Sequence, residues 1–402
     1  MKLKYSFKLS ILKLFIYDVL IFINTMLESL YSENNNISFL VRLFRYLSII
    51  LLFLTILLMK KYSKKHILIA GSILFCCIIN YILKDGSIGL ILTLLIFLSC
   101  KDLPSDKIIK HTVISVSFSY GFVIISSLCG IIDNMKLVRY LSIGVWQGKF
   151  ERQALGFQFP NQIPLMYLYI TAVIILGLQK NFRFFNMVIL MIPNIIIYFF
   201  CNARTPFILV IFMLLSCLLF NKYKGKSICM FPFILTLVSF LGSFILSIGY
   251  QNFKISKTLD LLLNSRLSSA YVTIKYYGIT LFGSGVDAGT KSSGIRNNFW
   301  DGFIANVDNG YLIFLLQYGL ILTLILLLIL LAFSFKIYKN GNVYFALVFS
   351  IVIIANIIDA NLVSFRIWPI LLIFANNYQP DRQAVIYNIF HIRFTSKKKK
   401  YN

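Results

Sequence analysis

Long apolar runs separated by short polar segments fill most of the chain. The runs are about 15 to 25 residues long, close to the length that an α-helix needs to cross a bilayer core, and they do not alternate as barrel strands do. The pattern predicts an all-α polytopic membrane protein, with a single transmembrane domain over residues 1–402. About twelve transmembrane helices are expected, at residues 11–30, 40–59, 66–83, 87–100, 111–132, 163–179, 184–201, 205–221, 228–249, 310–334, 343–358 and 361–378.

Basic residues lie in short clusters between these runs. The chain has 39 Lys and Arg against 14 Asp and Glu, a net charge of +25. On a soluble protein this excess would suggest nucleic acid, but between spans it indicates orientation, because cytoplasmic loops are enriched in Lys and Arg. A cytoplasmic N-terminus places the basic clusters inside, including the tail at 380–402. We therefore predict a multi-pass protein with both termini in the cytoplasm, membrane lipids around it and no nucleic-acid partner.

Two longer polar segments, 133–162 and 250–309, then share the opposite face of the membrane. The second is a long extracytoplasmic loop, in which apolar residues at 259–282 recur at helical spacing and predict an amphipathic surface helix. The composition agrees, at 59% hydrophobic and 13% charged residues with a mean hydropathy of +0.82. Seven cysteines and three histidines are scattered without metal-ligand spacing, so no disulfide framework, metal centre or cofactor is expected.

Arginines in the predicted outer segments are candidates for binding phosphate. Arg204 lies in FFCNARTPF, between two spans, and Thr205 follows it with a hydroxyl. Guanidinium is a planar, permanently charged fork that matches phosphate oxygens, although an arginine at this place also suits snorkelling to the interface. Arg152, Arg266 and Arg296 each suit a solvated surface or loop charge. Together, the arginines of several outer segments predict a diphosphate site at the outer leaflet.

The sequence Asp308-Asn309-Gly310-Tyr311 directly precedes a long apolar run. Asp or Asn at such a place caps a helix by accepting backbone N–H bonds. The alternative is that Asp308 or Asn309 binds sugar hydroxyls or orients an attacking one, and both roles are compatible. Tyr311 and other aromatic residues of the outer loop suit stacking on sugars, but an interfacial aromatic belt explains most of them. Gly283 and Gly285 allow a tight bend before this region.

Five short motifs occur in this order along the chain: GFQFPNQ with Asn161, NARTPF, NSRL, LFGSG and VDNGYLIFLLQYGLI. In this order they resemble the Wzy-type O-antigen and capsular polysaccharide polymerases of the O-antigen ligase/polymerase superfamily. The resemblance covers roughly residues 150–325 by motif and the whole chain by topology, and its most specific part is GSG…DNGYL…YGL.

The resemblance implies a GT-C-like, metal-independent glycosyltransferase in the bacterial cytoplasmic membrane. Such an enzyme transfers a glycan chain from undecaprenyl diphosphate to the non-reducing end of a lipid-linked repeat unit at the outer face. Arg204 and Arg266 would neutralise the leaving diphosphate, and Asp308 and Asn309 would serve the acceptor or the structure. The implied substrate is an undecaprenyl-diphosphate-linked oligosaccharide, and a flippase and a chain-length regulator are the implied partners.

One departure from the family bears on the chemistry. The related ligases carry a histidine in the large outer loop as the candidate base, and residues 250–309 contain none. This favours a polymerase over a ligase and leaves the base open among four carboxylates, those of Glu151, Asp287, Asp301 and Asp308. Two other functions stay open: a transporter or flippase of lipid-linked oligosaccharide, which the topology suits equally well, and a ligase that transfers the finished glycan.

Overall fold

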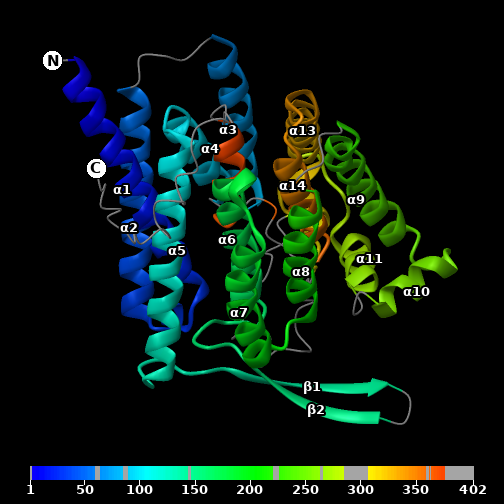
Figure 1. The fold of residues 1–402 in the computed structure, drawn as a ribbon. Helices are drawn as coiled ribbons and strands as arrows, with labels where there is room; N and C mark the ends of the chain where they lie inside the picture. The colour runs from blue at the N-terminus through cyan, green and yellow to red at the C-terminus, as the bar shows by residue number, and fades with distance from the viewer. Residues whose placement is uncertain are drawn as a thin grey trace, which may run out of the picture.

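The structure is a computed structural model, and it describes residues 2–58, 64–84, 89–143, 146–220, 226–262, 266–284, 307–358, 362 and 364–375. Within these residues the chain is a bundle of roughly parallel helices (Figure 1). The helices are α1 (Lys2–Glu28), α2 (Asn35–Leu57), α3 (Lys64–Lys84), α4 (Gly89–Cys100), α5 (Ser105–Leu128), α6 (Gln162–Leu178), α7 (Phe184–Cys201), α8 (Arg204–Leu219), α9 (Phe231–Ile248), α10 (Lys254–Leu262), α11 (Arg266–Tyr277), α13 (Gly310–Asn340), α14 (Val343–Ala355) and α15 (Trp368–Ala375). Short 3₁₀ turns occupy Leu30–Glu33, Gln179–Asn181 and Lys226–Met230.

The bundle has the character of a membrane protein. Six of its described helical segments are long and apolar enough to cross a bilayer: Leu9–Glu28, Asn35–Leu57, Ser105–Leu128, Phe184–Cys201, Lys226–Ile248 and Gly310–Asn340. Five shorter apolar segments have 10–17 residues, and α15 has 8. Each of the twelve expected spans therefore contains a helix, but about half of these helices are shorter than the expected span. The number of complete crossings stays a prediction.

Several element boundaries differ from those expected. Helix α5 begins at Ser105 rather than near 111, because Pro104, with its fixed φ of −61°, serves as its N-cap. Among the described residues of the last expected span, the helix covers Trp368–Ala375 and follows a turn at 364–367. The amphipathic helix expected at 259–282 is two helices, α10 and α11. Helix α11 ends at Tyr277 because Gly278 takes the left-handed conformation, with φ of +70°.

A two-stranded antiparallel hairpin departs from the all-α expectation. Strand β1 (Lys136–Ile143) pairs with β2 (Trp146–Gln153), and the register sets Lys136 opposite Gln153. The hairpin projects beyond the lower ends of the helices in Figure 1. Val138, Tyr140, Ile143, Trp146 and Phe150 are β-branched or aromatic residues, the types that favour strands.

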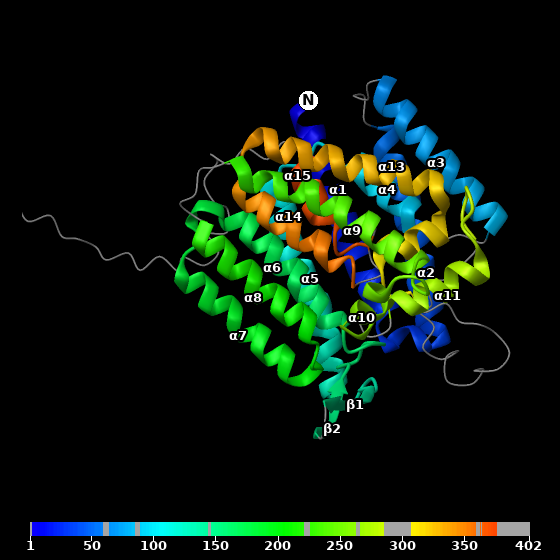
Figure 2. The same ribbon diagram turned by 90° about the vertical axis from the view of Figure 1, so that its right-hand side faces the viewer.

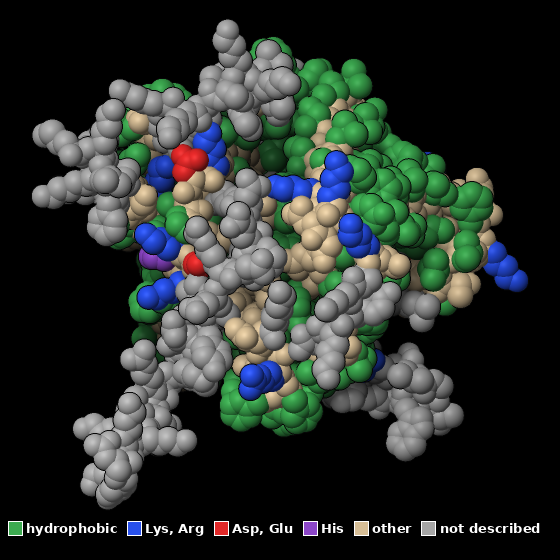
Figure 3. Space-filling view, turned by 45° about the horizontal axis from the view of Figure 1, so that its top comes forward, with side chains coloured by type: hydrophobic (Ala, Val, Ile, Leu, Met, Phe, Trp, Pro, Cys, Tyr) green, Lys and Arg blue, Asp and Glu red, His purple; other side chains and the backbone are tan. Residues whose placement is uncertain are grey.

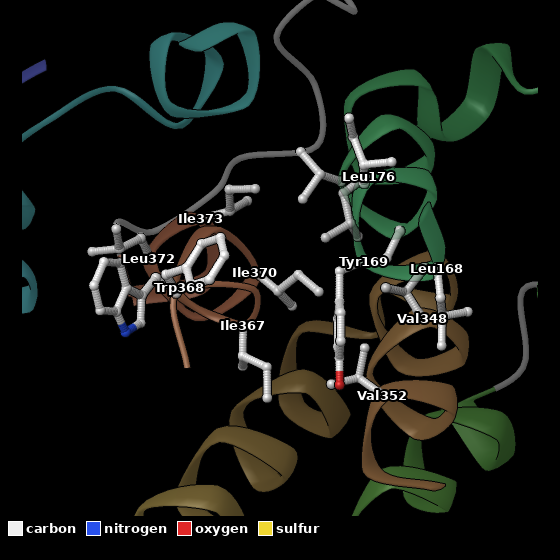
Figure 4. Close-up of a cluster of buried hydrophobic side chains, with 14 of the residues drawn as sticks. Leu168, Tyr169, Leu176, Val348, Val352, Ile367, Trp368, Ile370, Leu372 and Ile373 are labelled. Atoms are coloured by element: carbon white, nitrogen blue, oxygen red, sulfur yellow. The ribbon is translucent and has the colours of Figure 1, made fainter. Parts of the chain in front are cut away.

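The core is built around α6. Every residue of this helix except Tyr167 is buried, as expected for a helix that is apolar on all sides. Figure 4 shows Tyr169 of α6 pointing between Ile370 of α15 and Val352 of α14. In lipid, helices are held by such close packing and by interhelical hydrogen bonds. One of these bonds joins the indole N–H of Trp368 to Thr93 Oγ1, at 2.9 Å.

The two ends of the bundle differ in character. Figure 3 shows Lys and Arg side chains gathered at the end that is uppermost in Figure 1. Exposed basic residues of the expected cytoplasmic segments belong to this end, among them Lys107, Lys110, Arg183 and Lys339. The hairpin, α10, α11 and the N-termini of α8 and α13 lie toward the opposite end (Figure 1). The described parts of the two longer polar segments thus share one end, while the orientation of the bundle in the cell stays a prediction.

Candidate functional site

The turn between α7 and α8 presents the first group of predicted site residues. Helix α7 stops because Asn202 adopts the left-handed conformation, with φ 45° and ψ 43°, which Asn tolerates better than most residues. After Ala203, Arg204 begins α8, and Pro206 fits its first turn, where a missing N–H costs nothing. The side chains of Arg204 and Thr205 are exposed at this end of the bundle. They are therefore accessible to a molecule bound there.

Arg152 holds this turn in place. It lies near the end of β2, and its Nε–H donates to the Cys201 carbonyl at 3.0 Å, one of the last carbonyls of α7. A second nitrogen of the same guanidinium donates to Asn161 Oδ1. Arg152 and Asn161, both predicted to bind substrate, thus contact each other and a helix end. These contacts give Arg152 a structural role next to Arg204.

The N-terminus of α13 presents the second group. Arg266 Nη2 lies 3.6 Å from Asp308 Oδ2, and the Arg266 side chain is only 17% exposed against 50% for Asp308. Arg266 is the first residue of α11, whose backbone N–H groups at Leu267 and Ser268 donate to Asp260 Oδ1 at 2.8 and 3.1 Å. A capped helix start therefore holds the backbone at Arg266, and the carboxylate of Asp308 lies beside its guanidinium.

Asn309 and Tyr311 take structural positions in this group. Asn309 Oδ1 accepts from the N–H groups of Tyr311 and Leu312, so it is the N-cap of α13. Its Nδ2 donates to Ser243 Oγ on α9 at 3.0 Å. The Tyr311 hydroxyl donates to the Ile353 carbonyl of α14 at 3.1 Å, and the side chain is 2% exposed. Both residues thus serve capping and interhelical packing, and their predicted substrate-binding roles stay predictions.

Helix α11 rests on α13 rather than lying free on the surface. Ala270 of α11 packs in one buried cluster with Val307, Leu312, Ile313 and Leu316, and Figure 2 shows α11 beside α9 and α13. Helix α10, by contrast, exposes Ile255 and Leu261, as a helix at a membrane surface would. The packing of α11 against α13 sets the position of Arg266 relative to Asp308.

Comparison of the chain with protein-family models, with curated proteins and with solved structures found no match. The site is therefore interpreted from its own residues. Of the predicted set, Arg296 lies outside the described residues, as do Asp287 and Asp301 among the candidate bases. Glu151 lies on β2, exposed, with its Oε2 3.9 Å from Lys136 Nζ. Among the residues that the structure describes, no three His, Cys, Asp or Glu side chains gather as metal ligands would.

Sequence reasoning missed a break in α13. Gly319 has φ 86° and ψ 175°, which interrupts the helix at its tenth residue. The segment 278–284, here called the inserted segment, fills the gap. The N–H groups of Leu320 and Ile321 donate to the carbonyls of Thr280 and Leu281, at 3.0 and 3.3 Å. The backbone bonds lost at the break are thus replaced, as they must be away from water.

Asn80 of α3 completes this junction. Its Nδ2 donates to the carbonyls of Phe282 and Gln317, at 2.6 and 2.8 Å, and Ser284 N donates to Leu316 O at 2.8 Å. Gly283 and Gly319, one from LFGSG and the other from QYGL, touch each other here. A Cβ on Gly319 would lie 2.3 Å from Gly283 N. An amide within the apolar run FCCIINYIL was the only sequence signal for Asn80.

A buried ion pair, also missed, joins distant parts of the chain. Arg366 Nη2 donates to Glu28 Oε2 at 2.6 Å, and the Arg366 side chain is 1% exposed. The Tyr120 hydroxyl donates to the same oxygen at 3.4 Å. Next to Glu28, Leu30 N donates to the Gly156 carbonyl at 2.9 Å, which ties GFQFPNQ to the end of α1. An arginine inside the last apolar run was the available signal, since such charges are seldom kept without a role.

Proposed function

We propose that this protein is a glycosyltransferase of the bacterial cytoplasmic membrane that polymerises lipid-linked oligosaccharide repeat units at the outer face. The observation that carries the proposal is the Arg266–Asp308 pair, which places a cation and an exposed carboxylate 3.6 Å apart. A transfer from a sugar diphosphate to a hydroxyl needs both groups. The exposed Arg204 at the same end supplies a second cation.

In the proposed reaction, a hydroxyl at the non-reducing end of one repeat unit attacks the anomeric carbon of the growing glycan. The bond from that carbon to the diphosphate oxygen breaks, and undecaprenyl diphosphate leaves with the electron pair. The hydroxyl proton passes to the Asp308 carboxylate. Arg266 stabilises the charge that develops on the diphosphate, the kind of effect that gives an enzyme much of its acceleration. No metal is needed in this scheme.

The packing supports the roles given to these residues. The Asp260 cap and the cluster around Ala270 hold the backbone that carries Arg266, and the Arg266 side chain is only 17% exposed. Asp308 precedes the Asn309 cap, which keeps its carboxylate at the end of α13. Of the two candidate bases that the structure describes, Glu151 and Asp308, Asp308 is the one that forms an ion pair with a predicted phosphate-binding arginine. The resemblance of DNGYL and YGL to the polymerase family points the same way.

The test is a polymerisation assay with purified protein and lipid-linked repeat unit, read as a glycan ladder. Arg266→Ala is expected to reduce ladder formation by about 10²–10³-fold, as loss of one charge-stabilising group does. Asp308→Asn is expected to reduce it by about 10²–10⁴-fold, the range for loss of a general base. Arg183→Ala, an exposed arginine at the opposite end, is the matched control and should be unchanged. Full activity of Asp308→Asn would remove Asp308 as the base.

A second candidate, transport of the lipid-linked oligosaccharide, is favoured by the break at Gly319. Transporters bind substrates where helices are interrupted within the membrane. Cells lacking the protein distinguish the two functions. Loss of a polymerase leaves single repeat units at the surface, whereas loss of a transporter retains them inside the cell.

A further inference from the structure

An apolar cavity of about 230 Å³ lies between α3, α4, α13, α14 and α15. On α13 its lining residues recur every three or four positions, at Leu322, Leu326, Leu330 and Phe333. One face of the helix therefore forms a wall of the cavity. From Leu322 to Phe333 this wall extends for roughly 16 Å at 1.5 Å per residue. An elongated apolar space suits a chain better than a compact ring.

The cavity opens at the flank of the bundle. On the outer side its walls are Leu94 and Phe97 of α4 and Leu326 of α13, all partly exposed. On the inner side Leu322 of α13 and Val352 of α14 are buried. If the bundle spans a bilayer, this opening faces the lipid. An apolar chain can therefore enter sideways without crossing water.

One end of the cavity carries unsatisfied polar atoms. Two polar lining residues, Thr93 and Tyr311, have hydrogen-bond partners at 2.8 and 3.1 Å. Asn356 Oδ1 and Ser364 Oγ also line the cavity and are buried, and neither has a hydrogen-bond partner in the part of the chain that the structure describes. Asn356 is 1% exposed. Buried polar atoms of this kind normally have a partner, so this end is suited to the polar end of a bound molecule.

This polar end adjoins the candidate active site. The Asn356 carbonyl accepts from the N–H of Gly310 at 2.8 Å, and Asp308 precedes Gly310 by two residues. A molecule with its chain along α13 and its head at Asn356 would direct the head toward the Arg266–Asp308 pair.

We propose that this cavity binds the head-proximal part of the isoprenoid chain of the lipid carrier. Ser364 donates to an oxygen of the head group, and Asn356 Oδ1 accepts from a hydroxyl or a water bound there. The choice of an isoprenoid rests on the proposed function, while the cavity, its opening and its polar end do not. For scale, a smaller apolar cavity of about 150 Å³ in another protein stays dry and takes up benzene.

The experiment is photocrosslinking without turnover. Purified full-length protein in phosphatidylcholine nanodiscs is illuminated with a diazirine-bearing polyprenyl phosphate, and the labelled peptides are mapped. Labelling is expected on α4, α13 and α14, and unlabelled polyprenyl phosphate should compete at least tenfold better than phosphatidylglycerol. Leu326→Trp and Leu94→Trp, which narrow the opening from its two walls, should each reduce labelling about fivefold or more. Leu328→Trp is the control, because Leu328 is on α13 but 66% exposed and outside the lining.

Three results would overturn the proposal: labelling outside these helices, labelling unchanged in both narrowed variants that remain monodisperse, or equal competition by phosphatidylglycerol. The last result would assign the cavity to an acyl chain. Because no acceptor is present, the outcome is independent of the glycan ladder. Labelling as expected with no ladder would retain the isoprenoid site and reject the polymerase. A ladder without the expected labelling would support the polymerase and reject the isoprenoid site.

Discussion

Replacing Gly319 by Ala tests whether the break in α13 is required by the inserted segment. Gly319 has φ 86° and ψ 175°, a conformation essentially confined to glycine. An added Cβ would lie 2.3 Å from Gly283 N, 2.4 Å from the Leu281 carbonyl oxygen and 2.6 Å from its carbon. All three are backbone atoms, so no side chain can rotate away. Either α13 or the inserted segment must move.

The expected loss of stability has two parts. Holding Ala in this conformation costs on the order of 1–3 kcal/mol. Separating the two backbones also breaks the bonds from Leu320 N to Thr280 O and from Ser284 N to Leu316 O, at 3.0 and 2.8 Å. Each contributes about 0.5–1.5 kcal/mol net. The total of roughly 2–6 kcal/mol is a large fraction of the 5–15 kcal/mol typical of folded proteins.

The assay is the thermal midpoint of the purified protein in detergent, followed by size-exclusion chromatography at a fixed heating time. Gly319→Ala should lower the midpoint by at least several degrees. Gly242→Ala in α9 is the matched control, because no atom lies within 4 Å of its added Cβ, and Ala is favoured over Gly in a helix. Because Gly283 and Gly319 are in contact, combining Gly283→Ala with Gly319→Ala should cost less than the sum of both. Equal midpoints for Gly319→Ala and Gly242→Ala would refute the reasoning.

Four further predictions concern other contacts. Glu28→Gln removes the carboxylate that contacts buried Arg366 and should lower the free energy of unfolding by about 3–5 kcal/mol. Adding Arg366→Met should restore part of this stability, because no unpaired charge is then buried. Equal thermal midpoints for the single and double variants would contradict this. Asn309→Ala should lower the free energy of unfolding by about 0.5–2 kcal/mol, because the N-cap of α13 is lost. Asn309→Ser should retain most of the stability, because Ser also caps helices. A larger loss for Ser than for Ala would reject the capping role. Arg152→Lys retains the charge but loses the two-nitrogen contact of the guanidinium with the Cys201 carbonyl and with Asn161, so the thermal midpoint should fall. An unchanged midpoint would show that this double contact is dispensable. Cys129 is the exposed member of the seven cysteines, so a membrane-impermeant maleimide should label it from outside the cell, and labelling from inside only would reverse the predicted orientation.

The coarse architecture could be predicted from the sequence because bilayer thickness and apolar run length are directly related. Each expected span contains a helix, and NARTP forms the expected tight connection, in which Asn202 ends α7. The period at 259–282 also indicated helix, but it could not show that Gly278 would end it or that α11 would pack on α13. Those outcomes depend on partners that are distant in the sequence.

For the candidate site, the sequence indicated which residues could take part but not which of them are in contact. The sequence pointed to Arg266 and Asp308 separately, and their contact depends on how α11 packs against α13. Arg152 and Asn161 were expected to bind substrate, which stays a prediction, but their contact with each other and the bond from Arg152 to the end of α7 were not expected. Asn80 was not predicted, because an isolated amide in an apolar run gives no indication of the two carbonyls that it will reach. Its role arises from the break at Gly319, which local preferences alone do not reveal.

The junction at Gly319 also has a consequence for how the outer loop can diversify. The segment 285–306 starts after Ser284, which bonds to Leu316, and is followed by Val307, which packs in the same cluster as Leu316. Both of its anchors therefore belong to one short stretch of a single helix. The two contacts with Leu316 do not depend on the length or the sequence of the residues between the anchors. Under the proposed function, exchange of those residues is a route by which one scaffold accepts different sugars.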